Sequence, residues 1–242
     1  MPRYLLQIAY KGTHFCGLQK QIGLSTIQSE IEKSLEIVLK QKIDLLPISR
    51  TDAGVQAKQN FFYFDTDLII IPEQLYNFNA IIHRDIHLEN IKVVDDNFHA
   101  RFDAKSRTYQ YLVQQKRNPF RNDIAMFYPY KLNLDLLQES AHFILSQTDF
   151  SSFCKRHSDV NNFNCNILKS NWTQISPSVY MYEIEANRFL RGMVRGLVAT
   201  SLKVGRELIS IQELKEIFEK KDCVFADFSA DAKGLQLVKV AY

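Results

Sequence analysis

Residues 4–10, Tyr4-Leu5-Leu6-Gln7-Ile8-Ala9-Tyr10, carry the pattern that decides how the first half of the chain folds. Leu6, Ile8 and Tyr10 recur at every second position, which predicts a strand with one apolar face. Beyond this strand the apolar residues change to helical spacing and then back to alternation. We therefore predict the order strand, helix, strand, strand, helix, strand, which is the ferredoxin-like β-α-β-β-α-β unit.

The expected elements of the first half follow from apolar spacing and from end signals. Ser25-Thr26-Ile27-Gln28 fits a capping box at the start of the first helix, and Pro72 is typical of the first turn of the second. The strands are expected at 4–10, 43–49, 59–65 and 86–94, and the helices at 27–38 and 72–83.

The second half repeats this theme. Strands are expected at 106–114, 167–175, 178–186 and 235–241, and helices at 133–146, 189–204 and 210–220. Ser210 and Glu213 form a capping box for the last helix. The sequence predicts an α+β protein of two ferredoxin-like halves, with mainly antiparallel sheets around a central cleft. The expected domains are residues 1–104 and residues 105–242.

The composition describes a globular protein of the cytoplasm. The chain has 242 residues, of which 46% are hydrophobic and 24% charged, so disorder and collagen are excluded. The longest aliphatic run, 68–71, is far shorter than the ~20 residues that a membrane helix needs. Polar Gln7 interrupts the first apolar segment, which argues against a secretory signal.

The four cysteines do not indicate a disulfide framework or a zinc ribbon, because no CxxC pair occurs. Cys154, His157 and Cys165 can supply three metal ligands, but the neighbouring asparagines offer only amides as a fourth. We therefore expect no metal site. Neither GxxxxGK[ST] nor GxGxxG occurs, which disfavours nucleotide triphosphate and dinucleotide chemistry.

The net charge of +3 is unevenly distributed along the chain. Residues 1–104 contain 11 lysines and arginines against 13 acidic residues, and residues 105–242 contain 19 against 14. A basic half suggests an anionic partner such as nucleic acid.

Asp52 is the strongest candidate for chemistry. It lies in Arg50-Thr51-Asp52-Ala53-Gly54-Val55, a tight connection in which Gly54 permits positive φ. An adjacent guanidinium favours an ionised Asp, which can act as a nucleophile or stabilise a cationic sugar. The alternative is a β-turn in which Asp52 caps a backbone amide.

Three arginines and one tyrosine are further candidates. Arg188, Arg191 and Arg195 flank the apolar stripe of the helix expected at 189–204, where they either face phosphates or form a solvated rim. Tyr109 shares a strand face with Tyr111 and either packs in the core or stacks on a base.

Five ordered motifs give the chain a resemblance to the tRNA pseudouridine synthase A (TruA) family over almost its whole length. The segments that resemble family motifs are YKGTHFCGLQ at 10–19, RTDAGVQA at 50–57, FHARF at 98–102 with RTYQY at 107–111, NRFL with MVR between 187 and 195, and GLQL at 234–237.

The resemblance implies conversion of uridine to pseudouridine at positions 38–40 of the tRNA anticodon stem-loop, without cofactor or metal. It assigns Asp52 as the nucleophile, Tyr109 as a contact to the target base, and Arg50 and Arg195 as organisers of the site. Arg188 and Arg191 are then possible contacts to the RNA backbone. The resemblance also implies a homodimer and a base that is flipped out of its stack.

This chain departs from the family pattern at several positions. Gln56 replaces the usual His of the nucleophile motif, Leu18 replaces Trp, and Lys11 replaces a common acidic residue. Residues 165–167 and 232–233 also differ from the pattern. Two other functions remain open, namely a non-catalytic tRNA-binding or RNA-folding protein on the same scaffold, and an Asp-dependent nucleoside hydrolase.

Overall fold

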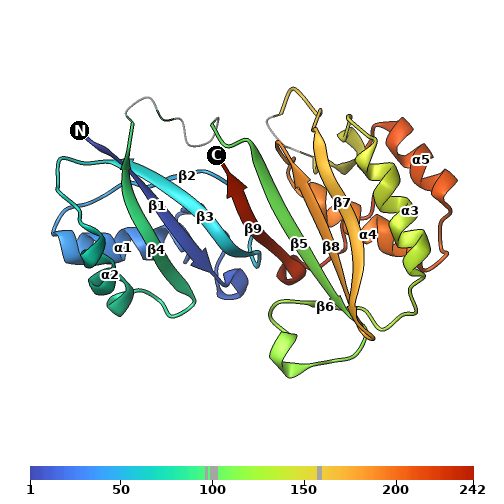
Figure 1. The fold of residues 1–242 in the computed structure, drawn as a ribbon, viewed down its shortest axis with the longest axis horizontal. Helices are drawn as coiled ribbons and strands as arrows, with labels where there is room; N and C mark the ends of the chain where they lie inside the picture. The colour runs from blue at the N-terminus through green and yellow to red at the C-terminus, as the bar shows by residue number, and fades with distance from the viewer. Residues whose placement is uncertain (96–97, 99–102, 157–159) are drawn as a thin grey trace. The chain divides into compact units, whose positions relative to one another are not determined.

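The structure is a computed structural model that describes residues 1–95, 98, 103–156 and 160–242 (Figure 1). The chain divides into two compact units, one of residues 1–105 and 236–242 and the other of residues 106–235. Each unit combines helices with a mainly antiparallel sheet, as expected for an α+β protein.

The first unit is built on three long strands. Its elements are β1 (Arg3–Tyr10), η1 (Gly12–His14), α1 (Ile27–Leu39), β2 (Leu46–Pro47), β3 (Gln56–Asp65), η2 (Pro72–Gln74), α2 (Leu75–Ile81), β4 (Ile86–Val94) and most of β9 (Leu235–Ala241). β1 pairs antiparallel with both β3 and β4. The other edge of β3 pairs antiparallel with β2 and parallel with β9.

The second unit has the strand order β5-β8-β7, with antiparallel pairing throughout this path. Its elements are β5 (Ser106–Gln114), η3 (Pro119–Arg121), β6 (Met126–Phe127), α3 (Leu134–Leu145), η4 (Ser151–Phe153), β7 (Ile167–Ser176), β8 (Val179–Ala186), α4 (Met193–Gly205), α5 (Ile211–Lys220) and η5 (Ala232–Gly234). The short β6 runs parallel to the end of β5.

Each unit has its own core. In the first, the expected face of β1 is buried, and the Ser34 hydroxyl on α1 donates to the Phe78 carbonyl on α2 at 3.1 Å. In the second, α3 packs against β7, α4 and α5 (Figure 1). Burial of such side chains is the main favourable term in folding. The fully buried aromatic residues are Phe62, Phe64, Phe78, Tyr111, Phe150, Phe153, Trp172 and Tyr182.

The strand predicted at 43–49 is wrong in extent, because only Leu46 and Pro47 form β2. Side chains of α1 take the backbone groups that would extend it: the Leu45 N–H donates to Glu32 Oε1 at 3.1 Å, and Gln28 Nε2 donates to the Leu45 carbonyl at 2.9 Å. Pro47 also has no N–H for a ladder.

The helix predicted at 189–204 is wrong at its start, because α4 begins at Met193. Gly192 has φ +74°, a left-handed conformation that interrupts the helical spacing. Arg188 and Arg191 therefore lie in the connection between β8 and α4, and Arg195 lies on the helix itself.

The predicted capping signals differ in outcome. Ser210 and Glu213 form the expected box at α5. At α1 the predicted position is wrong by one residue, since Thr26 is the N-cap and exchanges hydrogen bonds with Ser29. Among the described residues, the structure contains no helix with the length and apolar character to cross a bilayer.

Candidate active site

Asp52 lies in a turn that leaves its carboxylate unused. The Val55 N–H donates to the Asp52 carbonyl at 3.3 Å, and Gly54 completes the turn at φ +78°. The Asp52 side chain is exposed, and in the described part of its unit it makes no hydrogen bond or ion pair. The β-turn of the alternative is therefore present, but main-chain atoms close it, and in the described part of the unit the Asp52 side chain does not cap a backbone amide.

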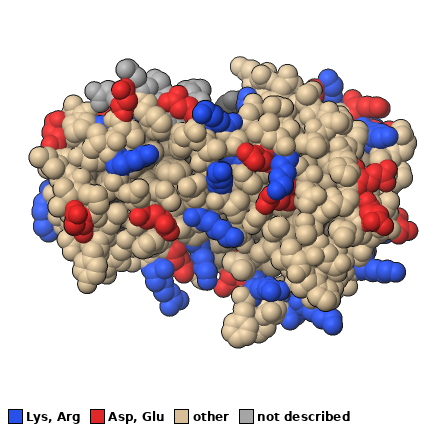
Figure 2. Space-filling model, in the orientation of Figure 1, with Lys and Arg blue, Asp and Glu red and all other residues tan. Residues whose placement is uncertain are grey.

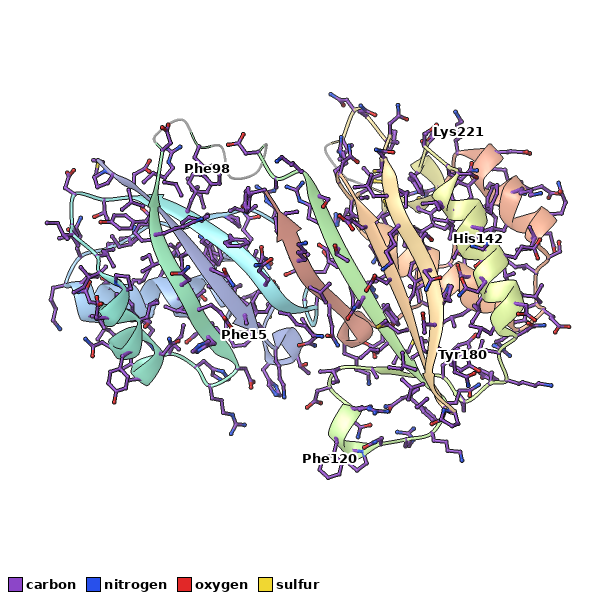
Figure 3. All side chains as sticks on the ribbon, viewed as in Figure 1. Phe15, Phe98, Phe120, His142, Tyr180 and Lys221 are labelled. Atoms are coloured by element: carbon purple, nitrogen blue, oxygen red, sulfur yellow. The ribbon has the colours of Figure 1, made fainter. Side chains whose placement is uncertain are left out.

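The turn at residues 12–18 holds the Asp52 loop by close backbone contact. A Cβ on Gly12 would lie 2.0 Å from the Val55 carbonyl oxygen, so only glycine fits there. The Leu18 N–H donates to the Thr51 carbonyl at 3.2 Å. Phe15, labelled in Figure 3, packs edge-on against His83 with ring centroids 5.1 Å apart.

A buried polar group fixes the start of the Asp52 loop. The Tyr10 hydroxyl lies 2.7 Å from the Thr51 hydroxyl, and Asn60 Nδ2 donates to both the Tyr10 hydroxyl at 3.2 Å and the Ser49 carbonyl at 2.9 Å. Burial raises the pKa of Tyr10 to about 12, so its hydroxyl stays neutral. Arg50 is exposed between these anchors, and no ion pair with Asp52 is present among the described residues.

Sequence reasoning missed this supporting group. The alternation of β1 predicts that Tyr10 is buried, but only the fold brings its hydroxyl to Thr51. The available signal was polar Asn60 within an otherwise aromatic strand, since a buried amide requires hydrogen-bond partners.

In the second unit, Tyr109 is buried on β5. It is 8% exposed, and its ring meets the Phe189 ring edge-on at 5.1 Å. Tyr111, on the same face, belongs to the core: it is fully buried, and its hydroxyl donates to the Asp231 carbonyl at 2.7 Å. Burial raises the pKa of Tyr111 well above its usual value.

Arg195 is held by a single backbone acceptor. Its Nε donates to the Ala230 carbonyl at 2.7 Å, and the side chain is half-buried on the first turn of α4. Within the described part of the second unit, its two Nη groups make no hydrogen bond or ion pair, so they can bind an external anion or carbonyl.

The other two arginines are placed by irregular backbone. Arg191 is exposed, and its carbonyl accepts from the Lys155 N–H at 3.0 Å. Arg188 is half-buried near Cys165. Burial raises the pKa of the Cys165 thiol to about 11, although the Arg188 charge opposes this shift.

The predicted site residues are thus distributed over both units. Arg50 and Asp52 belong to the first, and Tyr109, Arg195 and the pair Arg188 and Arg191 belong to the second. On the face drawn in Figure 2, basic and acidic side chains are interspersed. His157 of the possible metal site, and residues 99–102 of the tyrosine-bearing motif, lie outside the described residues. No cluster of three potential metal ligands occurs in the described ranges.

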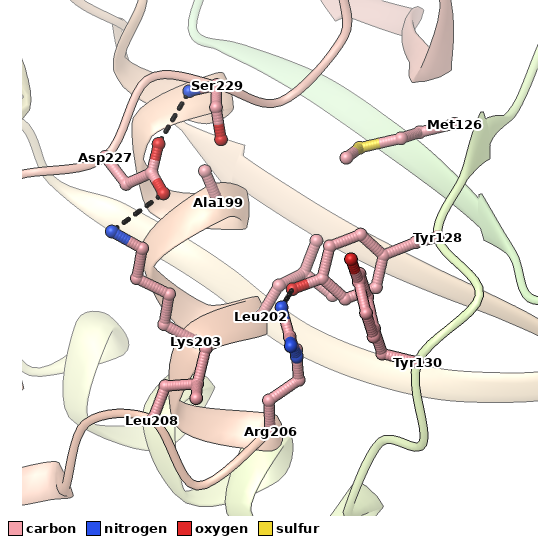
Figure 4. Close-up of a pocket in the computed structure, with 10 residues that line it drawn as sticks. All are labelled: Met126, Tyr128, Tyr130, Ala199, Leu202, Lys203, Arg206, Leu208, Asp227 and Ser229. Atoms are coloured by element: carbon pink, nitrogen blue, oxygen red, sulfur yellow. Dashed lines mark hydrogen bonds and ion pairs between the residues drawn. The ribbon is translucent and has the colours of Figure 1, made fainter.

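A separate cavity of about 250 Å³ lies in the second unit (Figure 4). The Arg206 guanidinium lies 3.6 Å from the centroid of the Tyr130 ring, and Lys203 pairs with Asp227 at 2.9 Å. None of the predicted site residues lines it. Its cations already have aromatic or acidic partners, which makes it a weaker candidate than the Asp52 loop.

Comparison with known proteins places the chain among modifying enzymes of tRNA. A family model described as "tRNA pseudouridine synthase" matches residues 147–242. The tRNA pseudouridine synthase A of Parabacteroides distasonis is 37% identical over 247 residues, covering all of this chain and 96% of the relative. That of Azobacteroides pseudotrichonymphae is 36% identical, covering all of this chain and 97% of the relative. A Staphylococcus aureus enzyme of the same name is 35% identical over 98% of this chain and 91% of the relative.

Proposed function

We propose that this chain, which belongs to the tRNA pseudouridine synthase A (TruA) family, isomerises uridine at positions 38–40 of the tRNA anticodon stem-loop. In this proposal Asp52 is the nucleophile. Membership makes the protein an isomerase of the pseudouridine synthase class. The position in tRNA and the role of Asp52 are the parts that we propose.

The Asp52 carboxylate, which is exposed and has no hydrogen-bond or ion-pair partner among the described residues, carries the proposal. Isomerisation must break the bond between C1′ of the ribose and N1 of uracil, turn the base, and join C1′ to C5. Attack of Asp52 on C1′ gives a covalent sugar intermediate, while assistance by proton removal is the alternative route. In the covalent route C5 then attacks C1′ and releases the Asp52 carboxylate. In either route the C5 hydrogen leaves as a proton and N1 gains one, so atoms and electrons balance without an oxidant.

The remaining site residues have supporting roles in this proposal. Tyr109 contacts the target uracil, and Arg50 and Arg195 organise the site. The fixed Nε of Arg195 supports this role because it leaves the terminal nitrogens oriented. Arg188 and Arg191 contact the RNA backbone.

We also propose that both halves, residues 1–104 and 105–242, are ferredoxin-like. In the first unit the antiparallel pairings β4–β1, β1–β3 and β3–β2 support this topology. In the second, the long elements β5, α3, β7, β8 and α4 have the same strand and helix order as β1, α1, β2, β3 and α2, with the short β6 between β5 and α3.

The partner is tRNA, from which the target nucleotide is flipped out, and the protein acts as a homodimer in the cytoplasm without cofactor. Flipping costs a few kcal/mol, least for unpaired bases or bases at the end of a stem. The basic second half supports an anionic partner.

Mapping of pseudouridine in an unmodified tRNA transcript after incubation with the purified protein tests the proposal. We expect pseudouridine at one or more of positions 38, 39 and 40. Salt-sensitive tRNA binding without isomerisation would favour the non-catalytic alternative, and release of free uracil would favour the hydrolase.

A further inference from the structure

Gln56 joins the Asp52 loop to the turn that packs against it. It is the first residue of β3 and is 4% exposed. Its Oε1 accepts from the Gly12 N–H at 2.8 Å, while its Nε2 donates to the Gly54 carbonyl at 3.0 Å and the Thr13 hydroxyl at 3.1 Å. One side chain therefore contacts both segments at once.

These contacts require one acceptor and at least one donor on the same side chain. The Gly12 N–H is buried and needs an acceptor, while the Gly54 carbonyl needs a donor. An amide provides both at every pH. Leaving either backbone group unpaired costs about 1–3 kcal/mol, so the bonded arrangement is strongly favoured.

We propose that Gln56 is a positioning residue for Asp52. Gly54 lies two residues after Asp52 and carries the positive φ of the turn, so a bond to its carbonyl fixes the direction in which the Asp52 side chain leaves the backbone. The inference rests on the proposed function, in which Asp52 performs the chemistry.

Two substitutions distinguish a positioning role from simple packing. As the pH falls, one new side chain loses a hydrogen bond of this arrangement and the other gains one. In Gln56→His, a neutral imidazole supplies one donor and one acceptor, but the imidazolium formed below about pH 6.5 has only donors and cannot accept from Gly12. In Gln56→Glu, the carboxylate accepts from Gly12 but cannot donate to Gly54, and protonation restores a donor. Burial raises the pKa of such a carboxyl, which brings its protonation toward the same pH range.

The experiment measures tritium release from tRNA labelled at uracil C5, giving kcat and KM from about pH 5.5 to about pH 8, a range that spans the imidazole titration. It compares the wild type with Gln56→His, Gln56→Glu and Gln56→Ala. The matched control is Gln59→Ala on the same strand, where the Gln59 Oε1 accepts from the Val240 N–H of β9 at 3.0 Å.

Charged groups on the neighbouring segments are present in all these proteins, and Gln56→Ala, which adds no charge beside them, separates the loss of the hydrogen bonds from the effect of a new charge. These charged groups are Lys11, His14, Arg50, Asp52, Lys58 and Asp85.

We expect kcat of Gln56→Ala to fall about 10- to 100-fold, with KM changed little, because small misplacements of a reacting group have effects of this size. The activity ratio of Gln56→His should fall on acidification and that of Gln56→Glu should rise, while Gln59→Ala stays near the wild type. If Gln56→Ala does not fold, the pH dependence of the activity ratios of Gln56→His and Gln56→Glu tests the positioning role.

Activity ratios that do not vary with pH, or a Gln56→Ala protein that is less stable but has wild-type kcat, would overturn the positioning role. Absence of tritium release from the wild type itself would instead overturn the proposed function, and the positioning role with it.

Discussion

At the residue scale, the availability of Asp52 follows from how its turn is closed. The Val55 N–H bonds the Asp52 carbonyl, and Tyr10 and Leu18 hold Thr51. The structure stabilises the main chain of the loop without using the carboxylate. Asp52 is therefore positioned by its neighbours while its side chain remains available to a ligand.

A substitution of Arg195 tests the proposed site at the same scale, because the role of Arg195 depends on the separate Nε and Nη nitrogens of its guanidinium. Nε donates to the Ala230 carbonyl, and in the described part of the second unit the two Nη groups make no hydrogen bond or ion pair. Lysine carries its donors on a single nitrogen, so it cannot hold the Ala230 carbonyl with one nitrogen and present two others to a ligand. We expect Arg195→Lys to lower kcat/KM for tRNA by about 10- to 100-fold, which corresponds to the loss of one charge-assisted hydrogen bond of about 1.5–3 kcal/mol.

The matched control for this prediction is Arg206→Lys, which changes a guanidinium in the cavity of Figure 4. It should retain nearly full activity. Equal losses in the two variants, measured as tritium release, would contradict a specific role for Arg195.

At the element scale, Gly192 determines where α4 begins and hence where Arg195 lies. Its φ of +74° is unfavourable for other residues by about 1–2 kcal/mol. A Cβ there would also lie 2.8 Å from Cγ of Lys155, a flexible side chain that can move. We expect Gly192→Ala to lose about 1–2 kcal/mol of unfolding free energy and to have reduced activity.

Gly23 is the control for Gly192, because its φ is also positive, at +73°, and a Cβ added there would meet open space. Gly23→Ala should lose similar stability in urea unfolding but keep its activity. If both variants keep wild-type activity, the start of α4 does not matter for the reaction.

The elements also show which features can be predicted from sequence. The Ser210 box and the alternation of β5 depend on neighbouring residues, and the structure confirms both. The extent of β2 depends on Gln28 and Glu32 of α1, which take the backbone groups of Leu45. No local pattern contains that contact, so the prediction of a longer strand was wrong.

The same distinction applies to the candidate site. The motif around Asp52 was visible in the sequence, but the anchoring of its loop by Gly12 and Tyr10 joins segments far apart along the chain. Arg188 and Arg191 have helical spacing to Arg195, but the positive φ of Gly192 removes them from the helix. Spacing alone does not reveal the conformation of a single glycine.

At the scale of the whole molecule, acid should destabilise the fold through paired carboxylates of the second unit. Burial raises the pKa of Asp149, Glu183 and Asp227, but hydrogen bonds outweigh it and lower each pKa below its usual value. The lysine donors are Lys221 at 2.8 Å from Asp149, Lys169 beside Glu183, and Lys203 at 2.9 Å from Asp227.

A carboxyl whose pKa is lower in the folded state stabilises the protein above its unfolded pKa, about 4, and loses that contribution as pH falls through the folded value. We therefore expect the free energy of unfolding in urea to decrease between about pH 5 and about pH 3. Asp149→Asn should make this decrease smaller. Equal unfolding free energies at both ends of the range would contradict the account.

The most direct test of the central claim is single-turnover tritium release by Asp52→Asn from tRNA labelled at uracil C5. The substitution keeps the size of the side chain and the backbone bond of the turn, so tRNA binding should remain within a few-fold of the wild type. We predict that release slows by more than about a thousandfold, as for loss of a catalytic nucleophile. Release at the wild-type rate would show that another group carries the reaction.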